Sequence, residues 1–202
     1  MEKIQVGGLR CIRPLREQEQ ALLLAQLPPQ RRERLLRTRR ERWQEPLCAY
    51  GVLLQLLRET LGWRTLPAVA CGEAGKPYFP TEPQVQFSLS HTEGAVLAAV
   101  SAGPVGVDVE RLRPVSPRLR REFDGTRGAA FFQNWVRLEA LGKLSGSGVW
   151  REWRGRPQES DRFFYPLELW EGYAAGAAST QPDAVLQIRQ YDLAALFPQQ
   201  GE

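Results

Sequence analysis

The sequence lacks any long hydrophobic run. Its longest, Ala95 to Val100, covers six residues, whereas a membrane-spanning helix needs about 20. The first ten residues also lack the basic start and the apolar stretch of a secretory signal. We therefore expect no membrane partner and a cytoplasmic location. With 202 residues and 43% hydrophobic content, the chain can bury the core of one medium domain or two small ones.

Cysteine and lysine are both scarce. The three cysteines, Cys11, Cys48 and Cys71, are widely spaced without a C-x-x-C pair. This pattern argues against a disulfide framework and against a thiolate metal site. Only three of the 27 basic residues are lysines. Because arginine is the usual cation of this chain, the choice of lysine at positions 76 and 143 is informative.

The net charge of +4 is unevenly distributed. Seven arginines crowd one segment: Arg31, Arg32, Arg34, Arg37, Arg39, Arg40 and Arg42. Such a run favours an anionic partner. A nucleic-acid binder built on an Arg31–Arg42 helix is therefore one alternative function, although Glu33 and Glu41 interrupt the run and no nucleic-acid motif accompanies it.

Hydrophobic periodicity predicts a largely helical start followed by strands. Between Ile4 and Pro14 we expect a short edge strand. Helices are expected from Glu17 to the Pro28-Pro29 pair, through the basic segment, and from Pro46 to Gly62. Later strands are expected at Ala68–Cys71, Gln86–Ser90, Gly94–Val100, Val105–Glu110 and beyond Phe163, with a helix at Phe131–Leu144. The pattern is that of an α+β protein.

A weak internal repeat relates Phe87–Val107 to Tyr165–Val185 at an offset of 78 residues, with seven identical pairs in 21. It predicts two similar halves, each with a hairpin around a Glu-Gly turn. The residues opposite His91, Asp108 and Glu110 are Leu169, Leu186 and Ile188. Polar chemistry is therefore expected in one copy and core packing in the other.

Two carboxylates stand at i and i+2 in a predicted strand, Asp108 and Glu110. This spacing puts both on one face, where their repulsion calls for a cation. Oxygen ligands with no His or Cys nearby favour magnesium over zinc. The alternative is a solvated strand end that binds nothing.

Glu139 and Lys143 stand at i and i+4 in the predicted helix. This is also the spacing of an ordinary surface ion pair. A lysine in an arginine-rich chain instead suits contact with a phosphate oxygen or a proton transfer. Lys76 lies in a turn, Gly75-Lys76-Pro77, and His91 lies where an apolar strand becomes polar. None of these residues, taken alone, indicates a function.

The order of these pieces resembles the 4′-phosphopantetheinyl transferase family, in its larger pseudo-dimeric type. The residues that carry the resemblance are Gly75-Lys76-Pro77, Phe87-Ser88-Leu89-Ser90-His91, Gly106-Val107-Asp108-Val109-Glu110 and Trp135-x-x-x-Glu139-Ala140-x-x-Lys143. The resemblance implies an α+β fold of two similar α/β lobes related by a pseudo-twofold axis. Each lobe would be a small, mostly antiparallel sheet packed with helices. We place the lobes at residues 1–104 and 105–202.

The resemblance also implies a reaction. The 4′-phosphopantetheine arm of coenzyme A would pass to a serine of an apo acyl or peptidyl carrier protein, with Mg²⁺ as cofactor and 3′,5′-ADP as product. By analogy, the metal ligands are Asp108, Glu110 and Glu139. The catalytic residues are Glu139, Lys143 and His91, and coenzyme A would be bound by Lys76, Ser90, His91, Arg31, Arg34 and Lys143. Two fused lobes imply a monomer.

The chain departs from the family pattern at three places. Leu138 replaces a lysine before the helix glutamate, Leu47 replaces an arginine, and the spacer between Asp108 and Glu139 is short. These departures leave a second function open, in which a catalytically weak or inactive relative binds coenzyme A or a carrier protein.

Overall fold

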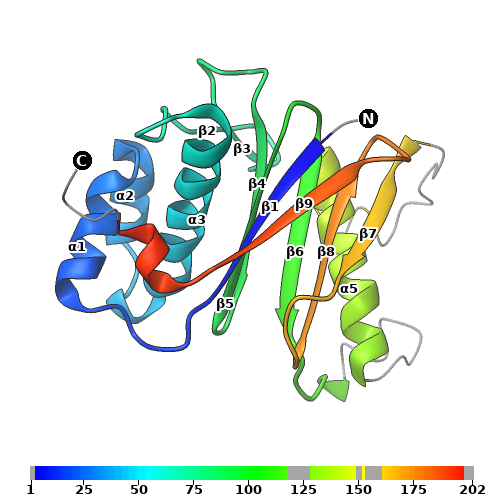
Figure 1. Ribbon diagram of the computed structural model, residues 1–202. Helices are drawn as coiled ribbons and strands as arrows, with labels where there is room; N and C mark the ends of the chain where they lie inside the picture. Colours follow the sequence, from blue (N-terminus) through cyan, green and yellow to red (C-terminus); the bar gives the residue numbers. More distant parts are fainter. Residues whose placement is uncertain (1–2, 118–127, 149–151, 153–160, 198–202) are drawn as a thin grey trace.

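Two β-sheets lie side by side and are flanked by helices on their outer sides (Figure 1). This arrangement is seen in a computed structural model, which describes residues 3–117, 128–148, 152 and 161–197. Mixed helices and small sheets confirm the predicted α+β class. Residues 118–127 of the short spacer lie outside the described residues.

The first sheet has the strand order β4-β5-β1-β9. Its strands are β4 (Gln86–Thr92), β5 (Ala95–Ser101), β1 (Lys3–Arg10) and β9 (Val185–Tyr191). β1 pairs antiparallel with β5 and parallel with β9. The predicted strand at β1 is confirmed, but its edge position is wrong. Alternation in one strand does not reveal that a strand some 180 residues later will cover its free side.

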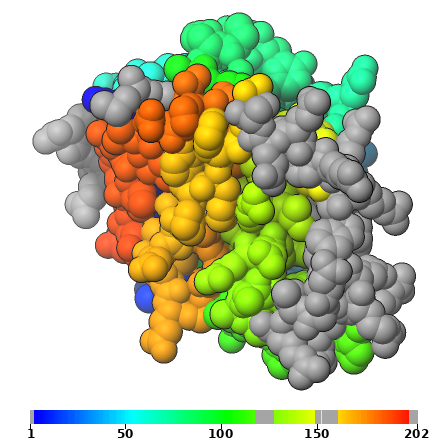
Figure 2. All heavy atoms as spheres, turned by 90° about the vertical axis from the view of Figure 1, so that its right-hand side faces the viewer, coloured from blue at the N-terminus to red at the C-terminus, as the bar shows by residue number. Residues whose placement is uncertain are grey.

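The second sheet has the strand order β6-β8-β7 and is antiparallel throughout. Its strands are β6 (Val105–Arg111), β8 (Tyr173–Ser179) and β7 (Phe163–Leu167). A separate hairpin joins β2 (Ala70–Cys71) to β3 (Pro77–Tyr78). Figure 2 shows the face on which α5 (Gly128–Ser145) lies beside the strands of the C-terminal half.

Helices α1 (Glu17–Gln26), α2 (Pro29–Leu36) and α3 (Gln44–Leu61) pack beside the first sheet, with a 3-10 turn, η1 (Arg40–Arg42), between the last two. α3 ends at Gly62 as predicted, because Gly62 adopts the left-handed conformation with φ 70°. None of the described helices is both long and apolar enough to cross a membrane.

The basic segment does not form the single helix that its nucleic-acid interpretation required. α2 ends at Leu36, where the Thr38 amide and the Thr38 hydroxyl both donate to the Leu35 carbonyl, at 2.9 and 2.7 Å. Local side-chain bonding of this kind competes with helix continuation. The exposed arginines therefore lie on a short helix, a loop and a 3-10 turn.

The core has two main parts. One lies between α3 and the first sheet and includes Leu53, Leu57 and Phe87. The other lies between the two sheets and includes Ile4 and Val107. All residues of β5 are buried, as its continuous apolar run predicts for a strand covered on both faces.

The two strands of the predicted repeat agree in length and in the turn that precedes each of them. β5 and β8 have equal lengths and stand 78 residues apart, and each follows a Glu-Gly turn whose glycine has positive φ, 74° at Gly94 and 78° at Gly172. α3 and α5 are both 18 residues long. One expectation is wrong: Ile188, opposite Glu110, is 46% exposed on the edge strand β9 rather than in the core.

Candidate active site

A row of hydroxyl groups on β4 joins the two sheets. Each hydroxyl oxygen accepts a backbone N–H from β6. The acceptors are Ser88, Ser90 and Thr92, and the donors are Val107, Val109 and Arg111, at 3.0, 3.3 and 3.4 Å. Because strand side chains alternate, a period of two puts all three hydroxyls on one face. The row fixes β6 against β4 and so positions the β6 carboxylates.

Asp108 is the buried centre of the site, with 4% of its surface exposed. Its Oδ1 accepts hydrogen bonds from Lys143 Nζ and from Ser90 Oγ, both at 2.7 Å. Lys143 Nζ also donates to Ser90 Oγ at 2.9 Å. Strand β4, strand β6 and helix α5 thus meet in a closed triangle of charged and polar atoms. A buried charge requires this kind of pairing.

Glu110 lies two residues further along β6, at a more open position. Its Oε2 accepts from Arg113 Nη1 at 3.0 Å and from Thr92 Oγ1 at 3.3 Å. Sequence reasoning missed both partners. The polar period of two along Ser88, Ser90 and Thr92 could have identified Thr92, whereas no sequence signal identified Arg113.

Glu139 lies one helical turn before Lys143 on the same side of α5. Burial raises the pKa of its carboxyl group, and the Asp108 and Glu110 carboxylates add to the rise, while the Lys143 ammonium opposes it. The other three predicted charged groups therefore all act on the Glu139 carboxyl group. A carboxyl group with raised pKa is better matched to accept a proton near neutral pH.

His91 is on the opposite face of β4 from the hydroxyl row and is exposed as a residue. Desolvation by nearby protein atoms lowers the pKa of its imidazole, and the Lys143 ammonium lowers it further, against the opposing effect of Glu45 and Asp108.

Lys76, a predicted coenzyme A contact, bonds to the protein backbone at the edge of a cavity. Its Nζ donates to two backbone carbonyls, Leu144 at 2.9 Å and Val105 at 3.2 Å. Its side chain still lines a cavity of about 210 Å³ together with Ser88, Gly142 and Lys143. The ammonium is thus engaged with the protein backbone beside this cavity.

The predicted arginines lie at another cavity. Arg31 and Arg34 line a space of about 400 Å³ with Ala70 and Cys71. Arg31 Nη2 contacts Cys71 Sγ at 2.7 Å. The neighbouring Arg32 donates to the carbonyls of Leu24, Ala25 and Leu27 around the end of α1. Arg32 therefore stabilises a helix terminus.

The carboxylate oxygens of the predicted metal set are of the type that binds a hard cation, but they do not converge on one point. No group of three or more His, Cys, Asp or Glu side chains that could hold a metal is found within the part of the chain that the structure describes. Asp108 Oδ2, however, is buried and has no hydrogen-bond partner. An orphaned buried oxygen is costly unless a ligand uses it. The metal set Asp108, Glu110 and Glu139 stays a prediction.

The two leucines that depart from the family pattern both lie among apolar side chains. Leu47, in the first turn of α3, is fully buried in the core. Leu138 packs against the cluster that contains Phe131 and Phe132. Neither position brings polar atoms to the site.

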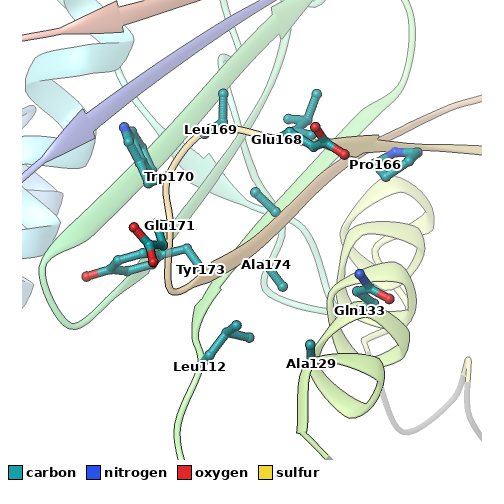
Figure 3. Close-up of a pocket in the computed structure, with 12 residues that line it drawn as sticks. Leu112, Ala129, Gln133, Pro166, Glu168, Leu169, Trp170, Glu171, Tyr173 and Ala174 are labelled. Atoms are coloured by element: carbon teal, nitrogen blue, oxygen red, sulfur yellow. The ribbon is translucent and has the colours of Figure 1, made fainter.

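A larger cavity, of about 410 Å³, lies between α5 and the connection from β7 to β8 (Figure 3). Leu112 and Ala129 line one side, and Glu168 and Trp170 line the other. It contains none of the predicted site residues, so the candidate site is the seam around Asp108.

Three curated proteins that match the chain carry the same family name. The chain is 25% identical over 161 residues to the 4′-phosphopantetheinyl transferase Sfp of Bacillus subtilis, covering 72% of each protein. It is 33% identical over 147 residues to the 4′-phosphopantetheinyl transferase AcpT of Escherichia coli O157:H7, covering 64% of this chain and 71% of the relative. A shorter match, 32% over 88 residues, is to the transferase psf-1 of Bacillus pumilus.

No family model matches the chain. The relatives nevertheless agree in name, and the match to AcpT covers more than two thirds of that enzyme. The chain belongs to the 4′-phosphopantetheinyl transferase family of enzymes, which transfer phosphopantetheine to carrier proteins.

Proposed function

We propose that this protein transfers the 4′-phosphopantetheine arm of coenzyme A to a serine of an apo acyl or peptidyl carrier protein, depends on Mg²⁺ and releases 3′,5′-ADP. The main support is the buried triangle of Asp108, Lys143 and Ser90 at the seam of the two sheets. Glu139 stands one turn away on the same helix as Lys143.

The proposed chemistry needs one bond exchange. The carrier serine oxygen attacks the phosphorus that bears the pantetheine arm. The bond from this phosphorus to the oxygen of 3′,5′-ADP breaks, and the serine proton passes to the Glu139 carboxylate. The raised pKa of Glu139 supports this role, because a stronger base accepts the proton more readily.

Asp108, Glu110 and Glu139 would hold the magnesium ion. When bound, the ion supplies positive charge against the pyrophosphate of coenzyme A. The unpartnered Asp108 Oδ2 is the oxygen best prepared for this role. Lys143 lies beside it and offers an ammonium to the same pyrophosphate.

The nucleotide end of coenzyme A would contact Lys76, Ser90 and His91. Arg31 and Arg34 would face the 3′-phosphate from their own cavity. We also propose a monomer located in the cytoplasm, with no nucleic-acid partner. The hydrogen bonds of Arg32 to the carbonyls of Leu24, Ala25 and Leu27 support the last point, because they leave one cation fewer for a phosphate backbone.

We further propose two lobes, at residues 1–104 and 105–202, related by a pseudo-twofold axis. The support is that β5 and β8, which stand 78 residues apart, have equal lengths, as do α3 and α5. One strand crosses this division, because β9 pairs with β1.

A binder without turnover is the second candidate, favoured by the apolar packing of Leu138. One experiment separates the two. The protein is incubated with coenzyme A, Mg²⁺ and a panel of apo carrier proteins, and each carrier is weighed by intact mass spectrometry. We expect one carrier to gain one phosphopantetheine group on its serine. Binding of coenzyme A without any gain would favour the second candidate.

A further inference from the structure

A buried carboxylate that the proposed reaction does not use is bonded to the loop after α5. Glu152 is only 7% exposed. Its Oε1 accepts hydrogen bonds from Ser147 Oγ at 2.6 Å and from Ser145 Oγ at 3.0 Å. Arg162 Nη1 donates to Oε1 at 2.7 Å and to Oε2 at 2.8 Å. Burial alone would raise the pKa of Glu152, but the bonds from Ser147, Arg162 and Ser145 outweigh burial and lower it.

The loop at residues 145–148 turns back on the end of α5. Gly146 and Gly148 both have positive φ, 74° and 78°, a conformation that a side chain would strain. The Gly148 amide donates to the Gly142 carbonyl of α5, and the Ser147 amide donates to Ser145 Oγ, both at 3.3 Å. These bonds are local, whereas the bonds of its two serines to Glu152 connect the loop, through Arg162, to the start of β7.

The same loop forms one wall of the cavity of about 210 Å³ that Lys76 and Lys143 also line. Gly146 lies against the stem of Lys76, because a Cβ at position 146 would meet Lys76 Cβ at 3.7 Å and Cδ at 3.8 Å. The Lys76 ammonium in turn donates to the Leu144 carbonyl in the last turn of α5. A shift of the loop would therefore change the shape of the cavity beside both lysines.

The ion pair of Glu152 and Arg162 is suited to hold such a loop. Neither residue is among the described residues that line the cavity, so both can act on a ligand there only through the loop. Phe164 of β7, two residues after Arg162, packs against the α5 cluster that includes Leu144. A buried ion pair gains little net stability, because desolvation offsets its attraction, but it can select one arrangement of the chain.

We propose that Glu152 is a positioning residue: together with Arg162 it holds the loop at residues 145–148 through the two serines, and the loop keeps the cavity in the shape that binds coenzyme A. The proposal rests on the proposed transferase function. It assigns no substrate contact to Glu152 or Arg162. Their loss should therefore weaken the binding of coenzyme A and leave the chemical step nearly unchanged.

The test breaks the link at two different places. Ser147→Ala removes one bond between the loop and Glu152 but leaves the ion pair with Arg162 intact. Glu152→Gln keeps an acceptor for the serine hydroxyls but removes the charge that pairs with Arg162. Ser147→Thr keeps the hydroxyl. Thr60→Ala is the matched control, because the Thr60 hydroxyl donates to the Leu56 carbonyl of α3 and Thr60 is not among the described residues that line the cavity.

Four quantities are measured for each protein. Calorimetry without a carrier gives the Kd of coenzyme A and of 3′,5′-ADP. Carrier modification well below the melting temperature gives kcat and KM for coenzyme A. Chemical denaturation gives the free energy of unfolding, and mass spectrometry follows amide hydrogen exchange in the loop.

For Ser147→Ala and Glu152→Gln we expect both Kd values and KM to rise about tenfold, the scale on which removing one hydrogen bond to a charged group changes an equilibrium. The value of kcat should stay within about threefold, the pattern of lost binding rather than lost transition-state stabilisation. Amide exchange should quicken in the loop. Ser147→Thr should restore both Kd values, and Thr60→Ala should match the unmodified protein.

Three results would overturn the proposal. Unchanged Kd values with a lower free energy of unfolding would make the ion pair structural only. A fall in kcat at unchanged Kd and KM would place the effect in the chemical step. Raised Kd values without faster exchange in the loop would show that the loop does not transmit the effect. If Glu152→Gln does not fold, Ser147→Ala decides by the same criteria, because it keeps the ion pair.

The same measurements separate this proposal from the proposed function. If the unmodified protein binds coenzyme A but modifies no carrier, the transferase function fails, and the Kd values and the exchange still decide the role of Glu152. If the unmodified protein binds no coenzyme A, both proposals are wrong.

Discussion

Gly106 of β6 faces the carbonyl oxygen of Ala140 on α5 so closely that a Cβ at position 106 would lie 2.0 Å from that oxygen. It would also lie 2.6 Å from the Leu144 amide nitrogen. Both neighbours are backbone atoms, which cannot rotate away. The strand and the helix that carry the predicted catalytic groups are therefore in direct backbone contact.

Replacing Gly106 by alanine should push α5 away from β6. We expect a loss of about 1–3 kcal/mol in the free energy of unfolding, together with a large loss of transfer activity. Gly72→Ala is the control, because a Cβ there would meet only the Lys76 carbonyl oxygen, at 3.8 Å. Chemical denaturation and carrier modification measure the two effects. An unchanged transfer rate in Gly106→Ala would show that the spacing of β6 and α5 does not matter.

Ser90 and Ser88 allow catalytic and structural roles to be separated. Both accept a β6 amide, but Ser90 also contacts Asp108 and Lys143. We expect Ser90→Ala and Ser88→Ala each to cost about 1–3 kcal/mol in stability, because each leaves a buried amide unsatisfied. Only Ser90→Ala should reduce kcat strongly. Equal effects of the two variants on kcat would assign Ser90 a purely structural role.

Asp108→Asn keeps the shape of the side chain and removes its charge. Because the half-buried Lys143 ammonium then loses its counter-charge and the metal set loses a ligand, we expect transfer to fall by about 1000-fold. Glu168→Gln, at an exposed position outside the seam, should leave transfer unchanged. Rates come from mass spectrometry of the carrier at several Mg²⁺ concentrations. Near-normal transfer in Asp108→Asn would refute its assignment as a metal ligand.

The hydrogen bonds of Glu19 predict that part of the free energy of unfolding is lost in acid. Its carboxylate accepts from Arg13 at 2.6 and 2.8 Å and from the Arg16 amide at 2.7 Å. The bond from Arg13 is the main cause that lowers the pKa of Glu19 from 4.5 to about 2. The folded state therefore binds this proton more weakly than the unfolded state. The stabilisation is present above pH 4.5 and is lost as the pH falls toward 2.

Glu19→Gln should accordingly lower the melting temperature at pH 7, and the difference from the unmodified protein should shrink below pH 4.5. Because the pair is close to solvent, we expect only about 1 kcal/mol at pH 7. Glu33→Gln, in an exposed pair at 3.9 Å, should have little effect. A constant difference between Glu19→Gln and the unmodified protein over this pH range would contradict the account.

Most elements were predictable because glycine and proline mark their limits. Pro28-Pro29 separates α1 from α2, Gly62 ends α3, and Glu93-Gly94 turns β4 into β5. The ordered motifs also placed Ser90, Asp108 and Lys143, which the fold brings into contact.

Long-range relationships were not predictable from local patterns. Nothing in the sequence of β1 indicates that β9 will pair with it. The direction of the Lys76 side chain depends on carbonyls contributed by two remote elements. Arg113 was missed because it follows the end of β6, where the strand pattern no longer indicates which way a side chain points. It pairs with Glu110, three residues earlier.

The most direct test of the central claim is a crystal structure of the protein with coenzyme A and Mn²⁺, with the ion located by its anomalous scattering. We predict one ion between the coenzyme A pyrophosphate and the carboxylates of Asp108, Glu110 and Glu139, with Asp108 Oδ2 as a ligand. An ion bound elsewhere, or held by the pyrophosphate alone while these carboxylates keep their present partners, would contradict the account.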